Sequence, residues 1–172
     1  QEDLTGAPLH PQYRHLPIDT KYFTDLELDI LALFDDLDAA LDGWLIKSEN
    51  YQALNTILPK FRERVQTIYI DPPFNTGDDF DYVDRFQDSS WLTLMENKLR
   101  LSKNFLYKKG SLFLHLDPRA DYYGRILLDD IFDKNNFRNE IIWAYTGAGT
   151  TPGQFPRKHD NILWFSKSED IL

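Results

Sequence analysis

The feature that most constrains the fold is a short apolar run that stops at two consecutive prolines. Residues 65–70 have the sequence Val-Gln-Thr-Ile-Tyr-Ile, and Asp71, Pro72 and Pro73 follow directly. The run is rich in β-branched and aromatic side chains, which favour a strand. Proline has no backbone N–H to donate to a neighbouring strand, so the strand is expected to end there. The sequence therefore predicts a strand whose carboxyl end carries Asp71-Pro72-Pro73-Phe74.

Strand-like and helix-like segments alternate along most of the chain. Apolar side chains at helical spacing predict helices over residues 22–41, 49–58, 89–107 and 118–132, with Ser89 or Ser90 and Asp117-Pro118 as candidate caps and Gly43, Pro59 and Gly110 as candidate ends. Short β-rich runs predict strands over residues 44–46, 65–70, 111–116, 140–145 and 161–165. The alternation predicts an α/β fold with a mostly parallel sheet covered by helices on both faces. Because the last two strands lack a helix between them, we expect them to pair antiparallel at one edge.

The charge balance limits what the chain can bind by itself. It has 28 acidic and 19 basic residues and a net charge of −9, whereas a DNA-binding domain usually shows an electropositive surface. Taken alone, this balance argues against a self-sufficient DNA-binding domain, and it is compatible with an active-site domain whose basic DNA-binding part lies elsewhere. The absence of cysteine excludes disulfides and thiolate metal sites, and no apolar run has the length of a membrane helix. Since the chain opens with Gln1, we expect it to be a piece of a longer protein.

The segment Asp71-Pro72-Pro73-Phe74, followed by Asn75-Thr76-Gly77, resembles the catalytic motif of amino-methyltransferases that use S-adenosylmethionine. Residues 16–167 are similar to the modification subunits of type III restriction systems and related adenine methylases. This resemblance implies a Rossmann-like methyltransferase fold of three layers, with an N-terminal arm over residues 1–20 and the catalytic part over residues 21–172. In that group the catalytic motif precedes the glycine-rich cofactor loop. We therefore expect the cofactor loop and the target-recognition region beyond residue 172, and the chain alone to be truncated and inactive.

Each residue of the motif suits methyl transfer to an exocyclic amine of a base. Such an amine has two N–H donors and a delocalised lone pair, so the site needs hydrogen-bond acceptors without competing donors. Asp71 supplies a carboxylate, while Pro72 and Pro73 supply carbonyls with no N–H beside them. Phe74 offers a flat face on which an extruded base can stack. The methyl donor is itself the electrophile, so catalysis would rest on positioning and electrostatics, with no metal.

The resemblance also implies the residues that contact the cofactor, S-adenosylmethionine. These are Asp71 and Phe74 of the motif, and Glu49 or Asn50 from the strand-then-helix element before it. Glu49 and Asn50 are equally consistent with a plain helix cap. A bare Asp-Pro-Pro is in turn consistent with a turn that ends a strand. Here the strand before the motif and the aromatic residue after it favour the catalytic interpretation.

The substrate and partners also follow from the resemblance. Aspartate at position 71 goes with adenine N6 in this family, so the implied reaction is methylation of a flipped adenine in double-stranded DNA. The alternatives are methylation of another amine, in cytosine N4, RNA or protein, and a non-catalytic fragment that retains the fold. The implied partners are DNA, a restriction–helicase subunit and a second copy of the chain, with no membrane. The implied location is the cytoplasm of a prokaryote or of a phage-infected cell.

Other segments carry weaker signals. No helix is expected after the glycine-rich residues 146–151, so they are not the cofactor loop. The aspartates within residues 78–88 lack the ligand spacing of a calcium loop, and no metal site is predicted. His115, at the end of an apolar strand, is expected to be buried and hydrogen-bonded. Arg157-Lys158-His159 with Phe155 is equally consistent with contacts to DNA phosphate and with an ordinary surface cluster.

Overall fold

The computed structural model of the chain describes residues 11, 19–75, 86–147, 152–153 and 155–170. Backbone contacts divide the chain into two compact units, Gln1–Ile46 and Lys47–Leu172. The unit that carries Asp71 therefore begins at Lys47, whereas the sequence places the start of the catalytic part at residue 21. The assignment of residues 21–46 to that part stays a prediction.

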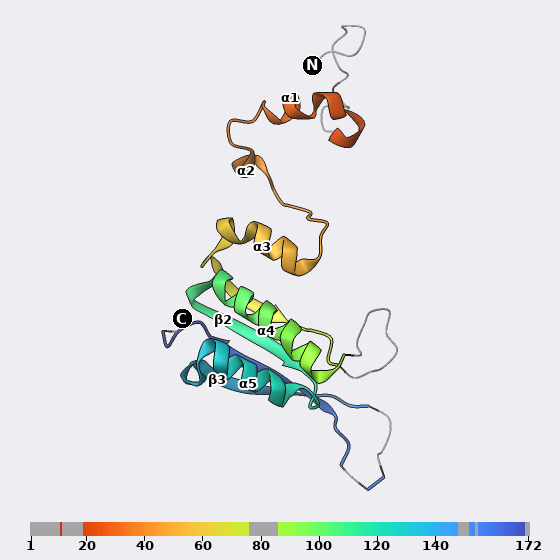
Figure 1. Ribbon diagram of the computed structural model, residues 1–172, viewed down its shortest axis with the longest axis vertical. Helices are drawn as coiled ribbons and strands as arrows, with labels where there is room; N and C mark the ends of the chain where they lie inside the picture. Colours follow the sequence, from red (N-terminus) through yellow and green to blue (C-terminus); the bar gives the residue numbers. More distant parts are fainter. Residues whose placement is uncertain (1–10, 12–18, 76–85, 148–151, 154, 171–172) are drawn as a thin grey trace. The chain divides into compact units, whose positions relative to one another are not determined.

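The predicted long helix over residues 22–41 is wrong. Figure 1 shows short separate turns in this part of the chain: 3-10 turns Thr20–Tyr22 and Thr24–Leu26 and helices α1 (Glu27–Leu31) and α2 (Leu37–Ala40). None of these pieces contains a buried residue, and a helix gains most of its stability from burying an apolar face. Asp36 accepts a hydrogen bond from the N–H of Ala39, which caps α2 as a new start. The strand predicted over residues 44–46 is also absent from the structure.

The second unit is built on a four-stranded sheet. Its strands are β1 (Val65–Ile70), β2 (Leu106–Leu116), β3 (Phe137–Ala144) and β4 (His159–Ser166), in the spatial order β1-β2-β4-β3. The α/β class and the antiparallel β3–β4 pair are confirmed. However, among the described residues β1 and β2 are the only strands that pair in parallel, because β4 lies between β2 and β3 and runs antiparallel to both. The sheet is therefore mixed rather than mostly parallel.

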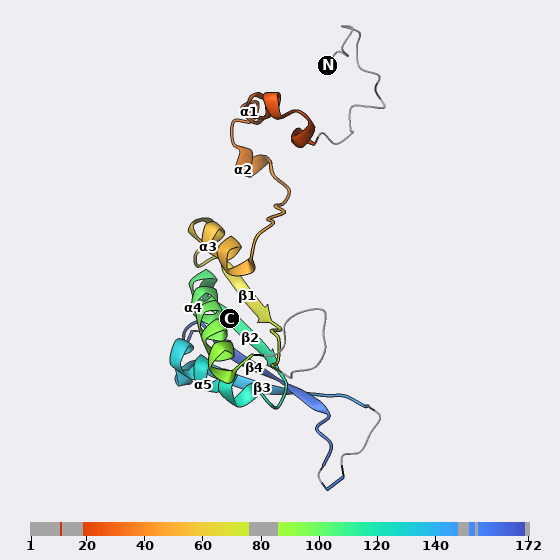
Figure 2. The same cartoon turned by 45° about the vertical axis from the view of Figure 1, so that its right-hand side comes forward.

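Helices cover one face of this sheet. The helices are α3 (Asn50–Phe61), α4 (Asp88–Phe105) and α5 (Asp121–Phe132), and α4 and α5 lie side by side against the strands in Figures 1 and 2. The side chains of β2 that point toward them, Leu112, Leu114 and Leu116, are fully buried. On the opposite face Tyr69 and Trp143 remain about half exposed. Within the residues that the structure describes, two of the three expected layers are therefore present.

Three helix termini differ from the predicted ones. Helix α3 passes through Pro59 to Phe61, because Leu58 and Phe61 pack in a small core with α4 and hold the last turn. Helix α4 begins at Asp88 after Gln87, without a side-chain cap from a serine. Helix α5 begins at Asp121 rather than Pro118.

Asp117 forms the turn that precedes α5. Its carboxylate accepts hydrogen bonds from the backbone N–H and the guanidinium Nε of Arg119, at 2.9 and 2.6 Å. Its carbonyl accepts from the N–H groups of Ala120 and Asp121. The predicted cap residue is thus used, but one turn ahead of the regular helix.

Gly110, predicted to end a helix, lies inside β2. A Cβ built on Gly110 would lie 3.0 Å from the carbonyl oxygens of Gln66 and Tyr107. The register between β1 and β2 shifts at this point, between Val65 and Thr67. The glycine therefore permits the close approach of the two strands that carry the parallel pairing.

Gly124 sets the distance between α5 and β2. A Cβ at Gly124 would lie 2.3 Å from Cδ1 of Leu116, which is fully buried and has little room to turn aside. We expect Gly124→Ala to lower the free energy of unfolding by about 1–3 kcal/mol through overpacking, although alanine is the better helix former by about 1 kcal/mol. Urea unfolding measures the effect. Ile126→Ala, exposed on the same helix, is the control and should change little. Equal stability of wild type and Gly124→Ala would contradict the close-packing argument.

Candidate functional site

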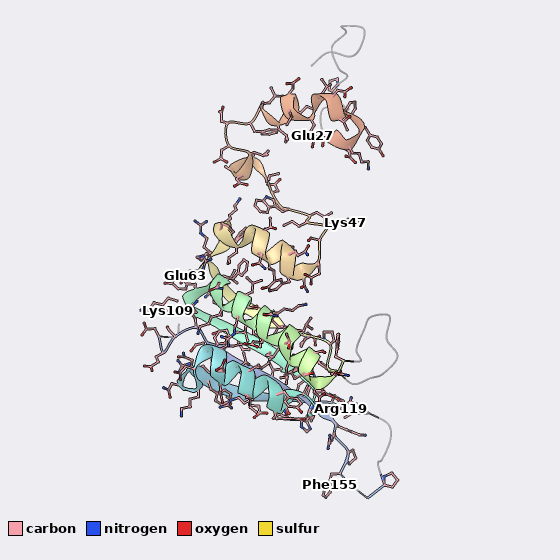
Figure 3. The ribbon with its side chains drawn as sticks, in the orientation of Figure 1. Glu27, Lys47, Glu63, Lys109, Arg119 and Phe155 are labelled. Carbon is pink, nitrogen blue, oxygen red and sulfur yellow. The ribbon has the colours of Figure 1, made fainter. Side chains whose placement is uncertain are left out.

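The predicted motif lies where four strand ends meet. Asp71 follows β1 directly, β2 ends at Leu116, β3 ends at Ala144 and β4 begins at His159. This edge is near the labelled Arg119 in Figure 3, at the opposite end of the sheet from Lys109. In open α/β sheets, ligands bind outside the carboxyl ends of the parallel strands. The position of the motif therefore agrees with its predicted role as a site.

Asp71 presents its carboxylate to solvent. The side chain is 61% exposed, and its Oδ1 lies 3.8 Å from Nδ1 of His115. An ionised carboxylate is an acceptor only and offers no donor. Asp71 is therefore placed to accept a hydrogen bond from a molecule that enters at this edge.

The two proline carbonyls are not equivalent. The indole N–H of Trp91 donates a 2.7 Å hydrogen bond to the carbonyl of Pro73, and Trp91 is only 1% exposed. The expectation that both carbonyls are acceptors without nearby donors is therefore wrong for Pro73. The carbonyl of Pro72 stays the predicted acceptor beside Asp71. The bond from Trp91 holds the turn against α4, a role that no local sequence pattern indicates.

Phe74 is half-buried and has two sets of neighbours. It packs against the main core under α4 and α5, and its ring centroid lies 5.5 Å from that of His115 at a tilt of 54°. The side chain is thus partly held by the protein and partly open at the edge of the sheet. Base stacking by Phe74 stays a prediction.

Asn75, quoted in the motif without a role, joins the turn to the start of α4. Its Oδ1 accepts from the N–H of Phe86 at 2.7 Å and its Nδ2 donates to Asp88 at 3.2 Å. Its φ of 61° is in the left-handed region, which asparagine adopts more readily than most residues. Tyr123 donates to the other oxygen of Asp88, and its neighbour Tyr122 together with Asp88 raises the pKa of Tyr123 to about 12, which keeps this donor protonated.

Glu49 and Asn50 have different surroundings. The Oε2 of Glu49 accepts from the N–H groups of Tyr51 and Gln52, at 2.8 and 3.2 Å. Glu49 is thus the N-cap of α3, as in the plain-cap alternative. Asn50 lines a cavity of about 460 Å³ between α3, α4 and β1, together with Ile70. A direct role of either residue in binding a cofactor stays a prediction, and the geometry favours Asn50.

His115 is hydrogen-bonded, as predicted, but it is only partly buried and it lies inside the site. Its side chain is 14% exposed. Nδ1 lies 2.9 Å from the hydroxyl of Tyr69 and Nε2 lies 3.2 Å from Oδ2 of Asp160. The ring of Trp143 stacks on it with centroids 6.0 Å apart. The sequence analysis did not single out Asp160 or Trp143. The signal that could have pointed to this group was the position of His115 at the end of the second buried strand. The rule that ligands bind beyond the carboxyl ends of strands applies to His115 as it does to Asp71.

The weaker candidates are described only in part. Lys158 donates a hydrogen bond to the carbonyl of Gly147, and Phe155 is 94% exposed. Of the acidic run, residues 78–84 lie outside the described part of the chain. Among the described residues, no group of three potential metal ligands occurs. Nor does any helix in that part of the chain have the length and apolarity to cross a bilayer.

Known proteins resemble this chain over the same region. Residues 65–171 match the protein-family model N6_N4_Mtase, described as DNA methylase. The chain is 44% identical to the probable type III restriction-modification enzyme HindVI Mod subunit of Haemophilus influenzae, over 76% of this chain and 18% of that protein. It is 24% identical to the type III restriction-modification enzyme EcoP15I Mod subunit of Escherichia coli, over 74% of this chain and 24% of that protein.

Two further similarities are to a type II methyltransferase and to a solved methyltransferase structure. The type II methyltransferase M.EcaI of Enterobacter cloacae is 29% identical over 77% of this chain and 31% of that protein. The solved PvuII DNA methyltransferase, which is cytosine-N4-specific, has a TM-score of 0.48 and 13% identity over 69% of this chain and 48% of that chain. The chain spans less than a third of the length of each of the three curated relatives.

Trp91→Phe tests the hydrogen bond that holds the turn. The variant keeps an aromatic ring but leaves the Pro73 carbonyl without its donor, which should lower the free energy of unfolding by about 1–3 kcal/mol. Amide hydrogen exchange at Phe74 and Asn75 should become faster. Trp164→Phe is the matched control, because its indole N–H donates to the hydroxyl of Ser111 at 3.0 Å, away from the motif. If both variants left exchange at Phe74 and Asn75 unchanged, Trp91 would not hold the turn.

Proposed function

Since this chain belongs to the DNA methylase family whose model matches residues 65–171, we propose that it carries the catalytic motif of an adenine-N6 DNA methyltransferase that uses S-adenosylmethionine. The observation that carries the proposal is the exposed carboxylate of Asp71, directly before Pro72 in the motif, at the carboxyl edge of the parallel pair. The names of the Mod-subunit relatives support a place in a restriction-modification system. We extend this to a restriction–helicase partner and a second copy of the protein.

Asp71 and Pro72 act on the amine of the base. Their oxygens accept hydrogen bonds from its two N–H groups. These hydrogen bonds favour the tetrahedral form of the nitrogen, whose lone pair is then available to attack the methyl group. S-adenosylmethionine supplies an electrophilic methyl group bonded to a sulfonium, which leaves as a neutral thioether. The amine gains the methyl group and loses one proton, which Asp71 accepts or passes to water. Phe74 stacks on the extruded base and holds it in place during transfer.

The described residues fit one side of such a methyl donor. The cavity of about 460 Å³ beside β1 is within the range of roughly 300–1,000 Å³ typical of small-molecule pockets. Its wall is mainly apolar, with the amide of Asn50 among its polar groups, and Ile70 in this wall directly precedes Asp71. Asn50 and Asp71 are therefore the residues that would hold the donor here. Glu49 is less suited to direct contact, because its carboxylate caps α3.

The choice of adenine rests on Asp71. The family model is named for both N6 and N4 methylation, so the family alone leaves both bases as substrates. Aspartate in this position resembles the adenine enzymes of the family, and we propose adenine N6 on that basis. The experiment uses the complete gene product with labelled S-adenosylmethionine and duplex DNA, RNA or protein, followed by analysis of the modified nucleosides. N6-methyladenine in DNA is the expected product, and N4-methylcytosine, or label only in RNA or protein, would contradict the proposal.

Asp71→Ala in the complete protein is expected to abolish methylation and leave DNA binding nearly intact. The carboxylate acts on the reacting amine, so its loss should appear in the chemical step. Single-turnover rates and DNA-binding titrations separate the two effects. Asp129→Ala, a carboxylate on α5 paired with Arg125, is the control. A rate for Asp71→Ala within about tenfold of wild type would mean that Asp71 supplies less than ~1.4 kcal/mol, too little for a central group.

Phe74 variants distinguish base stacking from core packing. If the ring stacks on the base, Phe74→Tyr and Phe74→Trp should keep much of the activity, and Phe74→Ala should lose about 1–3 kcal/mol of stacking. The loss should shrink on a duplex whose target adenine is mispaired, because extrusion is then easier. Methylation of matched and mispaired duplexes and thermal melting are measured on the same variants. Large destabilisation in both Phe74→Trp and Phe74→Ala without rescue by the mispair would place Phe74 in the core alone.

A further inference from the structure

His115 links the two carboxylates at the carboxyl edge of the sheet. Its ring lies between Asp71, with Oδ1 3.8 Å from Nδ1, and Asp160, with Oδ2 3.2 Å from Nε2. Tyr69, on the same face of β1 as Asp71, brings its hydroxyl to 2.9 Å from Nδ1. Each ring nitrogen thus has a hydrogen-bond partner, and Asp71 lies just beyond hydrogen-bond distance.

The partners of the ring fix where its proton lies. Burial, followed by the charges of Asp71 and Asp160, raises the pKa of Tyr69, so its hydroxyl keeps a hydrogen that it can donate to Nδ1. Because the carboxylate of Asp160 can only accept, the bond at Nε2 requires the ring hydrogen on that nitrogen. A neutral imidazole that accepts at Nδ1 carries its hydrogen on Nε2. That hydrogen points to the carboxylate of Asp160, which can only accept. The hydrogen bonds therefore run in one direction, from Tyr69 through His115 to Asp160.

Neighbouring groups hold this arrangement in place. Trp143 stacks on the imidazole with 6° between the ring planes, and Phe74 lies against it at 5.5 Å. The hydroxyl of Tyr145 donates to the second oxygen of Asp160 at 3.5 Å. Burial and the charge of Asp160 raise the pKa of Tyr145, which keeps it a donor. The ring plane and the orientation of the Asp160 carboxylate are therefore both constrained.

The direction of these bonds matters for Asp71. With the hydrogen on Nε2, the ring turns a lone pair rather than an N–H toward the Asp71 carboxylate. A hydrogen on Nδ1 would instead compete with the substrate amine for the same oxygen. We propose that His115, held by Tyr69 and Asp160, is a positioning residue that keeps donors away from Asp71, so that this carboxylate accepts only from the amine. This inference rests on the proposed methyl transfer and adds a residue to it.

The test uses single-turnover methylation by the complete protein, at saturating DNA and S-adenosylmethionine, on whichever DNA base the wild type accepts. His115→Phe keeps a ring between Trp143 and Phe74 but removes both nitrogens. We expect its rate to fall on the order of 10²-fold, because the hydroxyl of Tyr69 loses its acceptor at Nδ1 and can then donate to Asp71, with unchanged DNA affinity. His115→Asn should recover part of the rate, because its amide oxygen can accept from Tyr69. A merely structural histidine would show a rate that falls only in proportion to the loss of folded protein, with no recovery by asparagine.

A double-mutant comparison tests the link to Tyr69. Tyr69→Phe alone should lower the rate, but it should cost nothing further in the His115→Phe background, since the hydroxyl acts through the ring. Tyr107→Phe removes an exposed hydroxyl elsewhere on β2 and is the matched control, with no expected change. A His115→Phe rate within about twofold of wild type, or additive losses from the two substitutions, would overturn the inference and leave the proposed function standing.

A direct measurement separates this inference from the proposed function. Nitrogen NMR of the histidine-labelled complete protein reports which ring nitrogen carries the hydrogen, with the His115 signal identified by its loss in His115→Asn. A hydrogen on Nε2 supports the inference, and a hydrogen on Nδ1 overturns it. If the wild type methylates no DNA base, the proposed function fails, and the NMR result still decides whether the Tyr69–His115–Asp160 arrangement exists.

Discussion

The parallel pairing of β1 with β2 determines where every group of the site lies. Backbone hydrogen bonds set Ile70 opposite Leu114. Asp71 follows Ile70 in the chain, and His115 follows Leu114. Because side chains alternate between the faces of a strand, these two point to the same face. The antiparallel pairing of His115 with Ile162 then brings Asp160, two residues away on β4, to that face as well. Two carboxylates and an imidazole meet because the register of three strands puts them together.

Around Asp71, the hydrogen-bond donors named above bond to acceptors other than the Asp71 carboxylate. The indole of Trp91 donates to Pro73, the amide of Asn75 to Asp88, and the hydroxyl of Tyr69 to His115. An acceptor that already has a hydrogen bond within the protein gains less from a second donor. The carboxylate of Asp71, by contrast, is 61% exposed and can accept a hydrogen bond from a substrate. The arrangement suits a substrate amine whose two N–H groups both donate hydrogen bonds to acceptors of the protein. The prolines of the motif explain only part of this, since the carbonyl of Pro73 is occupied.

The sequence predicted the parts of the fold that depend on buried strands. The runs at residues 65–70, 111–116 and 161–165 are apolar enough to be recognised alone, and each lies within an observed strand. It failed where tertiary packing decides the outcome. Pro59 stays in a helix because Leu58 is buried against α4, and Gly110 lies inside a strand because β1 passes close to it. The apolar spacing over residues 22–41 gives no long helix, since none of those residues is buried.

The same limit applies to the site. The motif at Asp71 was visible because its residues are adjacent in the chain. Asp160 and Trp91 carry no local signal, since their roles arise only when β4 and α4 are in place. The position of β4 between β2 and β3 also has a consequence for how the chain folds. Hairpin β3–β4 is local in sequence, but β4 must then join β2, whose partner residues are 45 to 55 positions earlier. Such distant pairings form slowly, because the chain must lose the entropy of closing a long loop before the contacts between the strands can form. The group around His115 is therefore complete only after both distant pairings, β1 with β2 and β2 with β4, have formed.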